Sequence, residues 1–368
     1  MKLFEPMTIG GMHLPNRAVR SATYENRCEP DGKVTDELIR FYSVLAGGGI
    51  GLIITGNAMV HPWGLTAPNA LGIYSDDHLP GLTRLAQLFL DHGAYAVVQL
   101  SHGGRQTMPD LIGGRDVLAP SAVYSRSMKL TPREMTGKEI KEAMEAFVSA
   151  AERAQKAGFY GVQLHAAHGY LLSNFLSPFS NVRTDEYGGS TEGRTRILTE
   201  IFDRIQARCG KDFPVLLKLN SEEGIHGGLD VGEAARVVRI FDHKGFAAIE
   251  VSGGVYETGL SSRTKIKSRK DEAYFLSSAE RLRRETSIPL ILVGGIRSLE
   301  RVNEILDSGN VDMVSMSRPF IREPSLVKRW QEGDRLPVRC ISCNECMIKI
   351  FAGPVHCYQE EKERVQTV

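Results

Sequence analysis

Two histidines and a tyrosine follow one short apolar run and could together bind and protonate a polarised substrate. The residues are His165-Ala166-Ala167-His168-Gly169-Tyr170. If the chain turns helically there, imidazoles three residues apart lie on one side of it. Two imidazole N–H donors aimed at one carbonyl oxygen would stabilise negative charge on that oxygen, and a tyrosine hydroxyl could protonate a carbanion. The alternatives are a zinc-binding pair, or histidines that bond backbone carbonyls.

Glycines and an arginine follow the last two apolar runs and are typical of a phosphate site. These residues are Gly294, Gly295, Ser317 and Arg318. Backbone N–H groups can approach a phosphate where no Cβ intrudes, and the arginine supplies a cation. The alternative is that the glycines only turn the chain into the next helix. The glycine-rich stretch 47–51 precedes its apolar run, so it does not fit a dinucleotide fingerprint.

Three polar residues stand near the ends of otherwise apolar runs, namely Gln99, Lys218 and Ser252. A lysine within an apolar strand is costly unless it meets an anion, so we expect Lys218 to face a site. A structural salt bridge is the alternative. A phosphate-bearing cofactor whose ring needs hydrogen bonds and a nearby cation would account for these residues together with the phosphate site.

Eight short apolar runs could place all of these residues on one rim. They are 18–21, 52–55, 96–100, 161–165, 215–219, 248–252, 290–293 and 312–315. Stretches with helical periodicity lie between them, including 139–157, 195–209, 232–244 and 299–307. Continuously apolar runs indicate parallel strands covered on both faces. Eight strands, each followed by a helix, predict an α/β fold of the (β/α)8 TIM-barrel type, since a doubly wound sheet usually has five or six.

The connecting segments predict where the site lies. The segments 101–135, 166–194 and 253–274 are long, and in a barrel they emerge at the carboxyl ends of the strands, where sites are built. We expect residues 1–15 to cover the opposite end of the barrel. We divide the chain into a barrel, residues 1–330, and a C-terminal tail, residues 331–368.

The composition describes a globular chain without bulk charge. Of 368 residues, 42% are hydrophobic and 24% charged, which excludes a disordered or fibrous chain. The 45 Lys and Arg residues balance 44 Asp and Glu residues, so no net field draws the chain to nucleic acid or anionic lipid. No signal peptide or membrane-spanning run is visible. We therefore expect a cytoplasmic protein that acts on a small molecule, without nucleic-acid or membrane partners.

Several motifs resemble those of one family. They are NRAVRSAT (16–23), QLSHGGR (99–105), HAAHGYL (165–171), FLSP (175–178) and NVRTDEYGGS (181–190). In this order they resemble the Old Yellow Enzyme family of FMN-dependent oxidoreductases over residues 1–330. The resemblance implies that FMN lies in the barrel mouth. It assigns FMN binding to Ala22, Thr23, Gly56, Gln99, Lys218, Ser252, Gly294, Gly295, Ser317 and Arg318, with Tyr24 replacing Thr23 if the motif is shifted by one residue.

The resemblance also implies a reaction. NADH or NADPH would reduce FMN, and an α,β-unsaturated carbonyl compound would then take a hydride from the flavin in the same pocket, with ping-pong kinetics. His165 and His168 would hold the carbonyl oxygen of this substrate, and Tyr170 would protonate its α-carbon. His102 and Arg105 would either contact the substrate or order their loop.

The tail contains a cysteine cluster, Cys340-x2-Cys343-x2-Cys346-x10-Cys357. Its spacing suits an iron–sulfur cluster or zinc, and unliganded thiols are the third alternative. It resembles the tail of the trimethylamine dehydrogenase and dienoyl-CoA reductase branch, where a 4Fe-4S cluster passes electrons to FMN. The last spacing is shorter here, and we expect no second nucleotide-binding domain after Val368.

Other functions remain open at this point. One alternative is an amine or dienoyl-thioester oxidoreductase that exchanges electrons with a partner protein through the tail cluster. A zinc-dependent barrel hydrolase would need a carboxylate ligand that no strand end provides. A non-catalytic flavin-binding protein is a further alternative. The sequence does not determine whether the chain forms a homo-oligomer.

Overall fold

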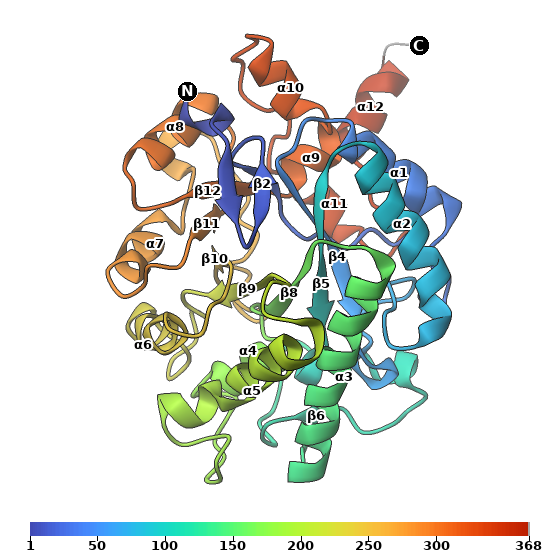
Figure 1. Cartoon of the computed structure of the whole chain (residues 1–368), viewed down its shortest axis with the longest axis vertical. Helices are drawn as coiled ribbons and strands as arrows, with labels where there is room; N and C mark the ends of the chain where they lie inside the picture. The colour runs from blue at the N-terminus through green and yellow to red at the C-terminus, as the bar shows by residue number, and fades with distance from the viewer. Residues whose placement is uncertain (367–368) are drawn as a thin grey trace.

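Eight parallel strands close into a barrel in the computed structural model, which describes residues 1–366. Each strand pairs with the next along the chain, and the last returns to the first (Figure 1). The barrel strands are β3 (Ala18–Arg20), β4 (Leu52–Met59), β5 (Tyr95–Ser101), β8 (Gly161–Ala166), β9 (Val215–Asn220), β10 (Ile249–Ser252), β11 (Leu290–Val293) and β12 (Met313–Met316). The predicted (β/α)8 barrel is confirmed.

Helices cover the outside of this barrel (Figure 1). They are α1 (Asp36–Ala46), α2 (Leu79–Asp91), α3 (Gly137–Ala157), α5 (Thr191–Cys209), α6 (Val231–Phe241), α7 (Leu276–Arg283) and α8 (Leu299–Asp307). Helix α3 shows why the sequence begins and ends it here. Thr136 and Glu139 form a reciprocal capping box at its start, and Gly158 ends it with a φ of 98°. Among the described residues, no helix is long and apolar enough to cross a membrane.

The barrel interior changes from apolar to polar along its axis. Alternate residues of each strand point inward. The lower layer is apolar and packs against the hairpin of β1 (Met7–Ile9) and β2 (Met12–Leu14), as expected for residues 1–15. One step further along the strands the inward side chains become polar and hydrogen-bond to one another: Ser21, Gln99, Gln163, Lys218, Glu250 and Ser315. This polar layer forms the floor of the space at the carboxyl ends of the strands.

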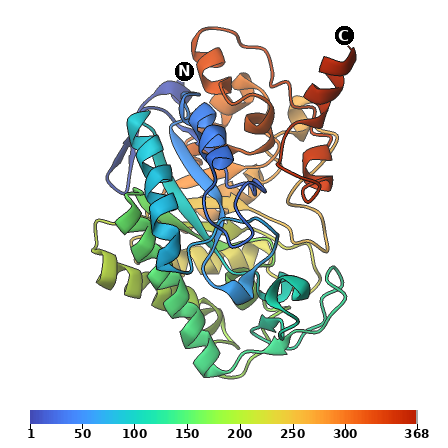
Figure 2. The same cartoon turned by 90° about the vertical axis from the view of Figure 1, so that its right-hand side faces the viewer.

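The loops and the tail meet at the other end of the barrel. Figure 2 shows the red C-terminal segment and the teal loop that follows β5 on the same side of the molecule, away from the N-terminal hairpin. The loops contain β6 (Leu118–Ala119), β7 (Arg133–Glu134) and α4 (Leu171–Leu176). The chain after β12 forms α9 (Arg318–Arg322), α10 (Leu326–Gln331), α11 (Glu345–Ile348) and α12 (Tyr358–Gln366). The tail thus returns to the rim where the strands end.

The motif at 181–190 lies in the loop after β8 and connects that loop to neighbouring segments through hydrogen bonds. The side-chain amide of Asn181 donates to the carbonyl oxygens of Phe175 and Tyr187, at 2.7 and 2.8 Å. The guanidinium group of Arg183 donates to the carbonyl oxygens of Pro120 and Met135, at 2.8 and 2.7 Å. These bonds tie three loop segments together, which gives the motif a structural role.

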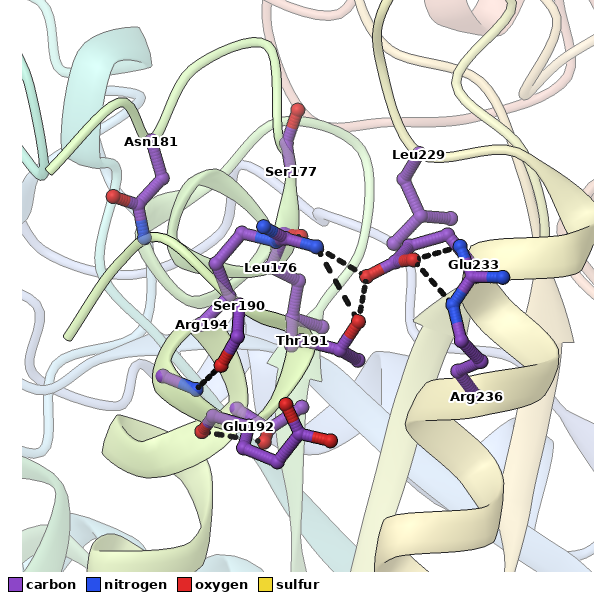
Figure 3. A network of polar contacts seen from close by, with 12 residues as sticks. Leu176, Ser177, Asn181, Ser190, Thr191, Glu192, Arg194, Leu229, Glu233 and Arg236 are labelled. Carbon is purple, nitrogen blue, oxygen red and sulfur yellow. Dashed lines mark hydrogen bonds and ion pairs between the residues drawn. The ribbon is translucent and has the colours of Figure 1, made fainter. Parts of the chain in front are cut away.

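Glu233 joins this loop to α6 (Figure 3). Its carboxylate accepts a hydrogen bond from Thr191 Oγ1 at 2.7 Å, binds the Arg194 guanidinium group, and binds the Nε of Arg236 at 2.8 Å. Arg194 also donates to the carbonyl oxygens of Leu176 and Gly189. The side chains of Arg194 and Glu233 are 10% and 6% exposed, whereas that of Arg236 is 58% exposed. Removal of a partner from the buried Arg194–Glu233 pair should therefore cost more than removal of the exposed Arg236.

We expect Glu233→Ala to lower the free energy of unfolding by about 3–5 kcal/mol, because it leaves a buried guanidinium group without its carboxylate. The control is Arg236→Ala, which removes the exposed partner of the same carboxylate and should cost under about 1 kcal/mol. Urea unfolding followed by circular dichroism measures both. Equal losses in the two variants would contradict the assigned roles.

Candidate active site at the barrel mouth

A cavity of about 520 Å³ opens at the carboxyl ends of the strands. Every barrel strand, or the residue directly after it, contributes to its lining. Most of the residues predicted from the sequence line it together: Ala22, Thr23, Gln99, His165, His168, Tyr170, Lys218, Ser252, Gly294, Gly295, Ser317 and Arg318. Tyr24 lines it as well, so Thr23 and its neighbour both face the cavity.

The rings of the two histidines lie close together in the cavity lining. Their ring centroids are 5.4 Å apart, and His168 turns the chain there with a φ of 62°. His165 Nδ1 accepts a hydrogen bond from the Ala167 N–H at 3.3 Å, so its Nε2 carries the proton and can donate. His168 Nε2 lies 2.8 Å from the Ser252 hydroxyl oxygen. His165 can therefore donate from its Nε2, whereas the Nε2 of His168 is engaged by Ser252.

Both imidazoles are neutral at pH 7. Burial and, to a smaller extent, the positive charge of Lys218 lower the pKa of His168 to about 3, although the charge of Glu250 opposes this shift. Burial also lowers the pKa of His165 well below 6.5, with contributions from His168 and Lys218. The histidines therefore act as hydrogen-bond donors and not as cations.

Tyr170 lies beside the two histidines, and its hydroxyl has a raised pKa. Its ring centroid lies 4.7 Å from that of His165. Desolvation raises the pKa of its hydroxyl well above 10, and the interaction with Tyr256 raises it further, while Thr66 lowers it. The hydroxyl is thus protonated at neutral pH and can serve as a proton donor.

The far end of the cavity has the features of an anion site. Gly294 and Gly295 adopt φ values of 130° and 67°, and a Cβ on Gly295 would come within 2.7 Å of the Tyr274 ring. Only glycine therefore suits this turn. Arg318 reaches the cavity while its Nη1 donates to the carbonyl oxygen of Arg263 at 2.9 Å, and the hydroxyls of Thr23 and Ser317 lie 2.7 Å apart.

The polar layer beneath the cavity includes two residues that sequence reasoning missed, Gln163 and Glu250. Lys218 lines the cavity as predicted, yet it also makes the alternative salt bridge, 3.2 Å from Glu250. Gln99 donates to Gln163 Oε1 at 2.7 Å. The signal that could have found them is strand parity. Gln163 stands two residues before His165, and Glu250 stands two residues before Ser252, so each points to the same side of its strand as the predicted residue.

Gly56 lies apart from the other predicted residues. This glycine lies outside the set of residues that line the cavity, and Asn57 lines it instead. The Gly56 N–H donates to Glu25 Oε1 at 2.9 Å and to the Tyr42 hydroxyl at 2.8 Å. A Cβ there would lie 2.0 Å from the Glu25 carboxylate. Gly56 is thus required for packing against Glu25.

His102 and Arg105 order their loop. His102 Nδ1 accepts from the Gly104 N–H at 3.1 Å, and Arg105 pairs with Glu257 at 3.0 Å. Neither residue is among those that line the cavity. Of the two roles that the sequence left open, the contacts therefore favour the structural one.

The tail forms one wall of the cavity through six residues: Ser342, Asn344, Met347, Ile348, Ile350 and Phe351. Asn344 binds the Arg318 guanidinium group with its side-chain oxygen, and its side-chain amide donates to the Ser262 carbonyl oxygen at 2.7 Å. The tail therefore contacts the anion site directly, which the sequence did not predict.

The four tail cysteines lie close enough to influence one another. Burial raises the pKa of Cys346 to about 11, and the neighbouring Cys340, Cys343 and Cys357 contribute to the rise. However, within residues 1–366 no group of three or more His, Cys, Asp or Glu side chains is arranged to hold a metal ion. The four thiols lie near one another, and the structure shows no metal site among the described residues.

Comparisons with known proteins agree with this geometry. The profile of the NADH:flavin oxidoreductase / NADH oxidase family matches residues 2–336. The NADH oxidase of Thermoanaerobacter brockii is 35% identical over 98% of this chain, which spans 58% of that protein. A 2-naphthoyl-CoA reductase solved with 2-naphthoyl-CoA superposes with a TM-score of 0.90 and 29% identity over 97% of this chain and 56% of its own.

An Old Yellow Enzyme homologue from Zymomonas mobilis superposes with a TM-score of 0.78 and 28% identity, over 93% of this chain and 95% of its own. The chain thus spans little more than half of the longer relatives and nearly the whole of the shorter one. The resemblance inferred from the motifs is confirmed, and the chain belongs to the NADH:flavin oxidoreductase / NADH oxidase family, which includes the Old Yellow Enzymes.

Proposed function

We propose that the chain is an FMN-dependent oxidoreductase that uses NADH or NADPH to reduce the activated C=C bond of α,β-unsaturated carbonyl compounds. The observation that carries this proposal is the grouping of two neutral imidazoles and a protonated tyrosine at one side of a cavity whose far end is an anion site. Donors of this kind suit a carbonyl oxygen that gains negative charge during reaction.

The cavity fits FMN in its donor set. Gly294, Gly295, Ser317 and Arg318 would hold the phosphate, and the Arg297 Nε in the same region is buried without a hydrogen-bond partner among the described residues. Gln99 and Lys218 would face the flavin ring, with Ala22, Thr23 and Ser252 around it. When bound, FMN supplies hydride acceptance from the nicotinamide and hydride donation to the alkene.

The residues of the chain bind the substrate and deliver the proton. His165 and His168 would donate hydrogen bonds to the carbonyl oxygen, which withdraws electron density from the β-carbon. Tyr170 would give its proton to the α-carbon. Since one cavity has to take both the nicotinamide and the alkene, the two would bind in turn, and we expect ping-pong kinetics.

A second candidate is an amine or dienoyl-thioester oxidoreductase that exchanges electrons with a partner protein through the tail. The observation that favours it is the extent of the similarity, because the family profile ends at residue 336 whereas the T. brockii NADH oxidase matches 98% of the chain. Cys340, Cys343, Cys346 and Cys357 would have to move to bind a 4Fe-4S cluster. Iron and acid-labile sulfide near four per chain would support this candidate, and metal-free protein that is reduced by NADH or NADPH alone would exclude it.

Replacing both histidines tests the substrate site. We expect His165→Asn/His168→Asn to keep FMN, to bind phenols more weakly, and to reduce enones at least about 100-fold more slowly, because N–H donors to the oxygen are displaced. Flavin absorbance during phenol titration and stopped-flow oxidation by an enone measure these effects. His102→Asn, a buried histidine outside the cavity, is the control. Wild-type turnover in the double variant would disprove the assigned roles.

The proposed role requires neutral histidines, which the pH dependence of stability tests. The pKa of each is lower in the folded than in the unfolded chain, so the stabilisation is present above about pH 6.5 and is lost as pH falls. At pH 5 the loss is roughly 2 kcal/mol per histidine. Urea unfolding at pH 7 and 5 should show a smaller decrease in the double variant than in the wild type. An equal decrease in both would mean that these imidazoles are not buried in neutral form.

Tyr170→Phe separates the two halves of the reaction. We expect flavin reduction by NADH or NADPH to keep its rate, while oxidation by an enone slows by about 100-fold or more because the proton donor is lost. Anaerobic stopped-flow absorbance measures the two half-reactions separately. A variant that is slowed only in flavin reduction would contradict the assignment of Tyr170 as the acid.

A further inference from the structure

The carboxylate of Glu250 is the centre of the polar layer beneath the cavity. Its Oε1 accepts hydrogen bonds from the hydroxyls of Ser21 and Ser315, at 2.6 and 2.8 Å. Its Oε2 accepts from the Gln163 amide at 3.1 Å and lies 3.2 Å from the Lys218 ammonium nitrogen. The side chain is 0% exposed. Four groups from four different strands or strand ends therefore depend on one carboxylate.

Glu250 itself does not line the cavity, but its partners do. Ser21, Lys218 and Ser315 all line the cavity directly. Gln163 is connected to the cavity by Gln99, whose amide donates to it at 2.7 Å. The carboxylate would therefore act on a bound ring through the side chains that it holds, as well as through its charge.

The Lys218–Glu250 pair carries no net charge. Desolvation raises the pKa of the buried Glu250 carboxyl, but the charge of Lys218 and the hydrogen bonds from Ser21, Ser315 and Gln163 outweigh it, so the pKa lies below its usual range. Glu250 is thus ionised at neutral pH. The Lys218 ammonium group lines the cavity, and the negative charge of Glu250 lies beside it, outside the cavity lining.

We propose that Glu250 is a positioning residue that sets the reduction potential of the bound flavin, by fixing the Lys218 ammonium group and by cancelling much of its field. The proposal rests on the proposed function, since it requires FMN in the cavity. Reduction adds electron density to the flavin ring, so a cation below the ring favours the reduced form and a carboxylate opposes it. With Glu250 in place, the base of the cavity presents a dipole instead of an isolated cation.

Glu250→Gln tests this role, because the side-chain amide keeps an oxygen for the serine hydroxyls and removes the charge, while its NH2 group replaces the oxygen that accepts from Gln163 and faces Lys218. At pH 7 we expect the FMN midpoint potential to rise. The equilibrium between oxidised and reduced flavin should shift at least about tenfold, which is ~30 mV for a two-electron couple. Sulfite, which binds electron-poor flavins, should bind at least about tenfold more tightly. Redox titration against a reference dye and sulfite titration measure the two effects.

Glu223→Gln is the matched control. Glu223 is also buried, at 3% exposed, and its carboxylate accepts from the Ser177 hydroxyl and the Leu229 N–H outside the cavity lining. This control should keep the wild-type potential. If Glu250→Gln lowers thermal stability and leaves both the potential and the sulfite affinity unchanged, Glu250 is merely structural and the proposal is overturned.

A second pair of variants keeps the test decisive if Glu250→Gln does not fold. Lys218→Met/Glu250→Gln removes both charges, so it leaves no unpaired buried ion. Its potential should lie above that of Lys218→Met alone, and equal potentials in the two would overturn the proposal. Wild-type protein that binds no FMN would instead contradict the proposed function, so the two failures are distinguishable.

Discussion

Closure of the eight strands into one barrel is the constraint on which the site depends. Because all strands run parallel, their carboxyl ends meet around a single mouth, and residues far apart in sequence face one cavity. The inward-facing side chains below the mouth are apolar, and they pack against the N-terminal hairpin. The polar layer lies directly above this apolar layer, where the low local dielectric strengthens its hydrogen bonds. Contacts of Arg183 and Glu233 hold the loop after β8 in place at the barrel rim.

The site is rich in donors and poor in net charge. His165 and His168 are buried in neutral form, Tyr170 keeps its proton, and Lys218 is paired with Glu250. A site of this kind responds to charge that develops during a reaction, because no strong fixed charge dominates it beforehand. The exception is the part of the cavity near Gly294 and Gly295, where Arg318 contacts the tail. The tail therefore belongs to the same cavity as the barrel.

Much of the fold could be predicted because parallel strands covered on both faces give continuous apolar runs, and all eight runs are strands of the barrel. The strand-end residues could be predicted for the same reason. Strand parity places Glu250 on the same side of its strand as Ser252, but its role could not be predicted, because a single acidic residue in an apolar run does not reveal its partners on other strands. The packing of Gly56 could not be predicted, because the residue that leaves no room for a Cβ there is Glu25, 31 positions away along the chain. The tail wall was missed because loop contacts follow no periodicity.

The central claim is that this cavity binds FMN, and the visible absorbance spectrum of the purified protein tests it most directly. The account predicts a yellow protein that releases about one FMN per chain on denaturation, because the polar layer and the anion site are formed together by the barrel. A preparation that is colourless, and remains so after incubation with FMN and removal of the excess, would contradict it.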